Sequence, residues 1–150
     1  VILHKGKMKM LEIDARFPSQ TPMAVYASTG VNMFEILVDL TLHEKLGPFF
    51  LPEKPDHAIV EHIRVSPQGI GFIGENIMKT CGPLHLETDF FGADEALTSF
   101  VPGCSSWVAT LIIKGKTRQE TLIKRSQILK ELSHRFNLPL LPDINPYDFS

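Results

Sequence analysis

Residues 57–79 read HAIVEHIRVSPQGIGFIGENIMK, and they contain a strong turn signal between two strand-like segments. Two segments rich in isoleucine and valine, His57–Val65 and Ile70–Lys79, flank the sequence Ser66–Gly69. The proline and glycine of that short sequence are typical of a tight turn. We therefore predict that the two segments pair as an antiparallel hairpin.

The same signals, followed toward the carboxyl terminus, predict two further strands. They lie at Leu84–Phe91 and Trp107–Lys114, where apolar and β-branched residues gather. The residues between them, Gly92–Gly103, are expected to be a connection that includes a short helix at Ala93–Phe100.

The last predicted element is a helix from about Arg118 to Phe136. Thr117 stands three residues before Glu120, which is the spacing of a capping box at a helix start. An apolar face at helical spacing follows: Leu122, Ile123, Ile128, Leu129, Leu132 and Phe136. The tail that comes after it, Asn137–Ser150, contains three prolines and is expected to be extended or partly ordered.

The sequence of the amino-terminal third predicts a hairpin, then a loop, then a helix that is broken into two pieces. Val1–Leu3 and Met8–Ile13 flank a turn that contains glycine, and Phe17–Pro22 reads as a loop because it contains two prolines. A helical segment then extends from Ala24 to about Leu46 and is divided at Gly30, with Asn32 or Thr29 as the cap of its second piece. The fold class predicted by all these elements is α+β, an antiparallel sheet with helices packed on it.

Composition excludes several classes of protein. With 150 residues, 43% of them hydrophobic, the chain is long enough for a buried core. The formal net charge of −2 argues against a nucleic-acid or membrane partner, and no stretch approaches the length of a bilayer-spanning helix. The partners we expect are therefore small molecules or another protein. Two cysteines without metal-ligand spacing fit a reducing compartment, so we expect a cytoplasmic protein.

A charged triplet at the end of the first hairpin carries the strongest chemical signal. Strand alternation places Glu12, Asp14 and Arg16 on one face. Two carboxylates suit Mg²⁺, and a neighbouring guanidinium can hold phosphate oxygens with a forked contact. The alternative is a solvent-exposed strand face with a cross-strand ion pair, which is the commoner role of such a pattern.

The residues around the triplet resemble the signature of the ATP-grasp superfamily, Glu-x-Asn-x-Arg followed by a substrate loop. Within this superfamily the chain most closely resembles the ligases of pyrrolysine biosynthesis. These ligases also have an aspartate at the position of Asp14, where the superfamily usually has asparagine. The resemblance runs almost residue for residue through Leu11–Pro22, and it continues at Ala24–Tyr26, Ser28, Gly30 and Asn32. Beyond residue 32 it is thinner but extends into the final helix.

This resemblance implies an ATP-dependent ligase that joins methylornithine to the side-chain amine of lysine through an acyl phosphate. It implies that Glu12 and Asp14 bind Mg²⁺ or Mn²⁺, and that Arg16 is catalytic and also contacts substrate. Ser19, Gln20, Thr21, Tyr26 and Ser28 would bind the amino acids, although for each of them ordinary loop capping is an equal alternative. ATP would be the co-substrate.

The same resemblance implies that the chain is the carboxyl-terminal part of a longer enzyme, with residues 1–136 in the ATP-grasp domain and 137–150 as a tail. The nucleotide-clamping lysine and the flexible phosphate loop of such enzymes are not found in this sequence, so the chain alone is expected to be inactive. The sequence does not determine whether the protein forms a homodimer. Two alternatives stay open as well: an ATP-grasp ligase for other amino acids, and a non-catalytic module that binds an amino acid or a protein.

Overall fold

A computed structural model describes residues 2–10, 20–74 and 82–142 of the chain. Within these ranges there are seven strands and three helices, and all pairings between the strands are antiparallel. The predicted α+β class is confirmed. No helix among these residues is both long enough and apolar enough to cross a membrane.

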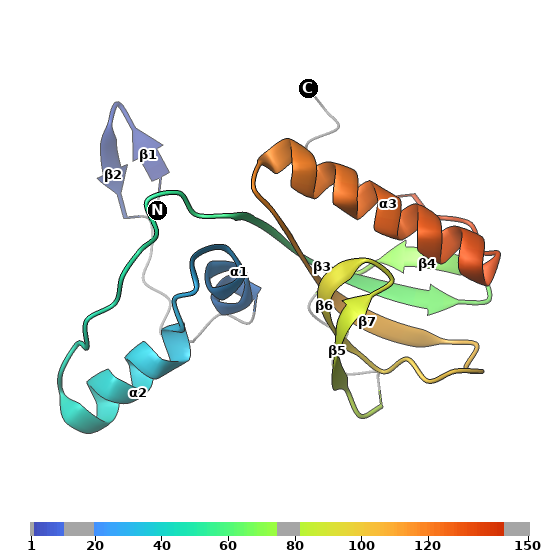
Figure 1. The fold of residues 1–150 in the computed structure, drawn as a ribbon, viewed down its shortest axis with the longest axis horizontal. Helices are drawn as coiled ribbons and strands as arrows, with labels where there is room; N and C mark the ends of the chain where they lie inside the picture. The colour runs from blue at the N-terminus through green and yellow to red at the C-terminus, as the bar shows by residue number, and fades with distance from the viewer. Residues whose placement is uncertain (1, 11–19, 75–81, 143–150) are drawn as a thin grey trace.

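The central feature is a five-stranded sheet with the strand order β4-β3-β7-β6-β5 (Figure 1). Its strands are β3 (His57–Ser66), β4 (Gly69–Phe72), β5 (His85–Phe90), β6 (Ala93–Thr98) and β7 (Trp107–Gly115). The predicted hairpin is confirmed, because β3 pairs with β4 and Ser66 lies opposite Gly69 across the turn. β4 is shorter than predicted and ends at Phe72, while residues 75–79 of the predicted strand lie outside the described ranges.

Strand β7 lies in the middle of the sheet because its sequence is apolar on both faces. Every residue from Trp107 to Ile113 is buried, as expected of a strand that is covered on both sides. It pairs with β3 along nine residues, from His57 opposite Gly115 to Val65 opposite Trp107. The strand predicted at Trp107–Lys114 is therefore confirmed, and the core forms around it.

The predicted short helix at Ala93–Phe100 is wrong, because these residues form β6 and the turn out of it. Phe91 and Gly92 have φ values of 50° and 95°, which reverse the chain tightly and start a hairpin with β5. β6 also pairs with β7 on its other side. Two ladders of hydrogen bonds outweigh the helix preference of alanine, glutamate and leucine in this segment.

The final helix, α3 (Arg118–Phe136), has the predicted bounds and lies across one face of the sheet (Figure 1). Ile128, Leu129 and Leu132 are buried against the sheet, as predicted. Ile123 is instead 49% exposed, while Thr121 is buried and donates a hydrogen bond to the carbonyl of Thr117 at 2.9 Å. The buried face is therefore rotated slightly from the predicted one.

One end of the core is aromatic. Neighbouring rings contact one another with centroids 4.6 to 6.4 Å apart and mostly edge to face, which is a favourable arrangement of their quadrupoles. They come from the end of β5, the β5–β6 turn, the loop before β7, β7 itself and the end of α3: Phe90, Phe91, Phe100, Trp107 and Phe136. This cluster joins α3 to the edge of the sheet.

The predicted N-cap of α3 at Thr117 is confirmed and provides a test of local stability, whereas the Glu120 carboxylate accepts from the amide of Lys116, one residue before the amide that a capping box uses. The Thr117 hydroxyl accepts a hydrogen bond from the Glu120 amide at 3.1 Å. We expect Thr117→Ala to lower the free energy of unfolding by about 1 kcal/mol, because that amide loses its partner. Ser126→Ala, an exposed position in the same helix, is the control and should change stability little. Urea denaturation measures both, and equal effects would contradict the capping role.

An ion pair that joins β6 to α3 makes the fold sensitive to acid. Burial by itself would raise the pKa of Asp94, but hydrogen bonds from the Lys124 side chain at 2.8 Å and the Lys114 amide at 2.6 Å outweigh burial. The pKa of Asp94 is therefore lowered below its ordinary value of 3.8. A carboxyl group whose pKa is lowered in the folded state stabilises the fold at pH values above its unfolded-state pKa. This stabilisation is lost as the pH falls through the folded-state pKa.

We therefore expect Asp94→Asn to flatten the acid limb of the stability profile. In the wild-type chain the free energy of unfolding should fall more steeply between about pH 5 and pH 2 than in the variant. Glu131→Gln, at an exposed position on α3, is the control and should keep the wild-type slope. Urea unfolding at a series of pH values measures this, and identical slopes for wild type and Asp94→Asn would contradict the prediction.

The amino-terminal third lies to one side of the sheet (Figure 1). Its elements are β1 (Ile2–His4), β2 (Lys7–Lys9), α1 (Gln20–Thr29) and α2 (Met33–His43). The predicted hairpin is confirmed for the described residues, and the predicted helix is broken at Gly30, where φ is 76°. Asn32 caps α2 by accepting hydrogen bonds from the amides of Phe34 and Glu35.

Two details of this region differ from the sequence prediction. Gln20, Thr21 and Pro22 belong to the first turn of α1 rather than to a loop, because the first turn of a helix tolerates proline. No residue of α2 is buried, although its apolar positions have helical spacing. The helix was predicted correctly, but its apolar side chains do not join the core.

The described part of the tail is attached to the edge of the sheet. The Ile70 amide donates to the carbonyl of Pro139, and the Leu141 amide donates to the carbonyl of Ile70, both at 2.9 Å. Residues 139–141 thus lie beside β4, while Asn137 and Leu138 complete the end of α3. Residues 143–150 of the predicted tail lie outside the described ranges.

Candidate functional site

The predicted metal ligands and the predicted catalytic arginine lie outside the described residues. This applies to Glu12, Asp14 and Arg16, and also to the substrate residue Ser19. Within the described ranges, no group of three or more histidine, cysteine, aspartate or glutamate side chains is arranged to hold a metal ion. The magnesium site therefore stays a prediction, and the structure describes the elements that follow it in the chain.

Helix α1 starts four residues after Arg16 and carries the other predicted substrate residues. Gln20 and Thr21 lie in its first turn, and Tyr26 and Ser28 lie near its end. At a rise of about 1.5 Å per residue, the two groups are separated by roughly 10 Å along the helix. The four side chains therefore form two pairs at opposite ends of α1.

The pair at the end of α1 lines an open depression of about 440 Å³. Tyr26 is 57% exposed, so its phenol group is accessible. The Ser28 hydroxyl donates a hydrogen bond to the carbonyl of Val25 at 3.2 Å, which leaves its oxygen as an acceptor. The depression is lined by Tyr26, Ala27, Ser28, Thr29, Gly30, Pro52, Lys54, Asp56, Lys114 and Lys116. Tyr26 and Ser28 line this depression together, whereas Gln20 and Thr21 do not line it.

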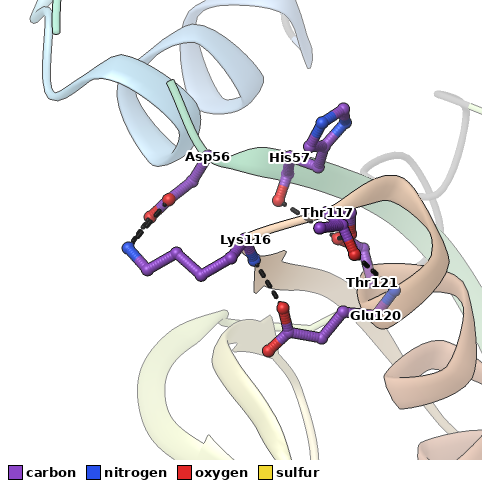
Figure 2. A network of polar contacts seen from close by, with 6 residues as sticks. All are labelled: Asp56, His57, Lys116, Thr117, Glu120 and Thr121. Atoms are coloured by element: carbon purple, nitrogen blue, oxygen red, sulfur yellow. Dashed lines mark hydrogen bonds and ion pairs between the residues drawn. The ribbon is translucent and has the colours of Figure 1, made fainter. Parts of the chain in front are cut away.

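A polar network fixes one side of this depression (Figure 2). The Asp56 amide donates to the carbonyl of Ser28 at 2.9 Å, which joins the end of α1 to the residue before β3. The Asp56 carboxylate accepts from Lys116 Nζ at 2.9 and 3.1 Å. The Lys116 amide in turn donates to Glu120 Oε2 at 2.8 Å. Three elements, α1, β3 and α3, are therefore linked at this point.

The same network stabilises the charged form of the Lys116 side chain. The hydrogen bond and the charge of Asp56 raise the pKa of Lys116 above its ordinary value of 10.5. Lys116 is therefore cationic at neutral pH, and Lys54 and Lys114 also line the depression, together with the single carboxylate residue Asp56. Hydroxyl groups beside several cations suit a ligand that carries a carboxylate or a phosphate.

Sequence reasoning did not single out Asp56, Lys54, Lys114 or Lys116. Asp56 and Lys116 are 60 positions apart, and neither belongs to a local motif. The only signal available was the position of Lys116 directly before the capping residue Thr117, which places its amide near a helix start. The pairing itself depends on the β3–β7 register, which a single sequence does not reveal.

No protein-family model matches the chain, and no solved structure matches it significantly. The chain is similar to 3-methyl-D-ornithine--L-lysine ligase of Methanosarcina barkeri, with 32% identity over 136 residues, which cover 89% of this chain and 36% of that protein. The ligase of the same name from Methanosarcina mazei is 32% identical over 132 residues, which cover 86% of this chain and 34% of that protein.

These similarities confirm that the chain resembles part of an amino-acid ligase of this kind. It spans about a third of the length of the curated relatives it matches. The resemblance first seen in residues 11–32 therefore extends along most of the chain. The α+β fold agrees with a carboxyl-terminal portion of an ATP-grasp ligase.

Proposed function

We propose that this chain is the carboxyl-terminal part of an ATP-dependent ligase that joins methylornithine to the side-chain amine of lysine in pyrrolysine biosynthesis. The observation that carries the proposal is the similarity to 3-methyl-D-ornithine--L-lysine ligase along 89% of the chain. In this proposal residues 1–136 belong to the ATP-grasp domain, 137–150 form a tail, and the enzyme works in the cytoplasm.

The proposed reaction has two steps. ATP transfers its terminal phosphoryl group to the carboxylate of methylornithine, which gives ADP and an acyl phosphate. The neutral side-chain amine of lysine then attacks the acyl carbon. The new C–N bond forms, the C–O bond to phosphate breaks, and the amine loses a proton to water.

The charged triplet supplies the groups that such a phosphoryl transfer requires. The carboxylates of Glu12 and Asp14 are hard oxygen donors and fit Mg²⁺ or Mn²⁺ as a donor set. A bound divalent ion neutralises charge on the phosphate oxygens. Arg16 holds the transferring phosphoryl group and the acyl phosphate by a forked contact, because its guanidinium matches phosphate geometry.

Helix α1 divides the proposed substrate contacts into two groups. Gln20 and Thr21 follow the triplet closely in the chain, so we assign them, together with Ser19, to the reacting end of an amino acid. Tyr26 and Ser28 lie roughly 10 Å further along the helix and line the depression that includes Lys114 and Lys116. We assign this second group to a distant polar end of a substrate, since amino acids with long side chains have two such ends.

A hybrid ligase tests the proposal. In it, residues 1–150 of this chain replace the segment of the Methanosarcina mazei ligase that they match, so that the ATP-binding part is restored. We expect phosphate release from ATP and Mg²⁺ that requires both methylornithine and lysine. Residues 1–150 alone should release none.

The outcomes separate the competing functions. Release with another pair of amino acids, but not with methylornithine and lysine, would indicate an ATP-grasp ligase of different specificity. A folded hybrid that binds an amino acid without needing ATP or Mg²⁺, and that releases no phosphate, would indicate a binding module instead. Either result would contradict the proposed function.

A further inference from the structure

Helix α2 carries an apolar stripe that faces solvent. Its members have the spacing i, i+3, i+4 and i+8, which places them on one side of a helix. They are Phe34, Leu37, Val38 and Leu42, and they are 57%, 44%, 51% and 71% exposed. We call these four residues the α2 stripe. A stripe with this spacing is typical of a helix that packs on another protein surface.

The chain itself covers a different side of α2. Residues Gly47–Phe50 run beside the helix and form a hollow with Glu35, Ile36 and Asp39, which lie on another side from the stripe. Gly47 approaches so closely that a Cβ atom there would be 3.1 Å from Asp39 Oδ2. The segment that follows α2 is therefore already placed, and it leaves the α2 stripe at the surface.

We propose that the α2 stripe is the docking surface for the polypeptide that corresponds to the two thirds of the ligases that this chain does not span. The proposal rests on the proposed function, because that function requires an ATP-binding part to complete the site. It commits to an apolar protein surface as the partner. Contiguous exposed apolar side chains of this number mark interaction sites on soluble proteins.

The comparisons support this partner. The match to the Methanosarcina barkeri ligase leaves only about a tenth of this chain unmatched, which is fewer residues than α2 and the segment to Leu51 contain. At least part of this region therefore has a counterpart in the ligase. In that protein the counterpart belongs to a polypeptide almost three times as long as the matched segment.

Hydrogen exchange on the isolated chain and on the hybrid ligase tests the proposal. We expect the amides of α2 to exchange at least tenfold more slowly in the hybrid, because the stripe becomes covered. Leu37→Glu should lower the thermal midpoint of the hybrid by at least about 5 °C, yet change the isolated chain by less than about 2 °C. Ile123→Glu on α3, at a residue that is 49% exposed, is the matched control and should change both proteins by the same small amount.

Equal exchange of α2 in the two proteins would overturn the proposal, as would a hybrid that tolerates Leu37→Glu. A dimer of the isolated chain whose α2 amides are protected would assign the stripe to a second copy and would overturn it as well. A hybrid with a protected α2 that releases no phosphate would keep the docking surface and reject the proposed function.

Discussion

Replacement of Asp14 by alanine is expected to lower the rate of phosphate release by the hybrid ligase roughly 100- to 1000-fold, and Arg16→Ala should have an effect of similar size. Asp14 is proposed to hold the metal ion, and Arg16 is proposed to hold the phosphoryl group as its charge is redistributed. Both groups stabilise the transition state more than the bound substrates, so the loss should appear mainly in kcat. Steady-state phosphate release with saturating ATP and both amino acids measures it.

The controls are two exposed side chains of the same charges on α3. Glu131→Ala and Lys130→Ala remove a carboxylate and an ammonium group that lie outside the proposed site. Both should leave kcat unchanged within about twofold, as surface substitutions usually do. If Asp14→Ala and Arg16→Ala behave like these controls while the hybrid stays active, the triplet is only a charged strand face.

The largest expected loss of stability follows from removal of Arg125. Its guanidinium donates from Nε to both carboxylate oxygens of Glu61 at 3.0 and 2.9 Å, and the side chains are only 15% and 16% exposed. It also lies 5.2 Å above the ring of Phe72. Arg125→Met leaves the carboxylate of Glu61 in this poorly hydrated position without its guanidinium, so the free energy of unfolding should fall by about 3 kcal/mol.

Two further variants show whether the buried charge causes that loss. The double substitution Glu61→Leu with Arg125→Met should recover most of the stability, because no charge is then left between β3 and α3. Lys116→Met removes the ion pair between Lys116 and Asp56. Because the Lys116 side chain is 80% exposed, this substitution should change stability little. Urea denaturation compares all of them, and a double variant no more stable than Arg125→Met would contradict this explanation.

The elements that the sequence predicted well are those with local signals. The bounds of α3 agree with the structure because Thr117 caps the first turn through the Glu120 amide and the apolar spacing continues to Phe136. The hairpin of β3 and β4 was predicted because a single short segment reverses the chain. The break at Gly30 was predicted because a glycine interrupts the helical spacing.

The errors lie where contacts distant in sequence override local preference. The segment Ala93–Thr98 has helix-forming residues but lies between two strands, and its partner β7 is known only from the fold. Ile123 has helical spacing with the core residues, yet it lies at the margin of the buried face. In the candidate site, Asp56 and Lys116 meet through strand pairing, and neither residue has a motif.

The pairing of β3 with β7 also has a consequence for the order of folding. Its partners are separated by about 40 to 60 residues, so a long loop must close before the first pair can form. The hairpins β3–β4 and β5–β6 close short loops and can form earlier. Because β7 also holds β6, we expect the rate-limiting barrier to lie at the entry of β7 between the two hairpins, and chains that stall before this step will expose the most apolar strand of the protein.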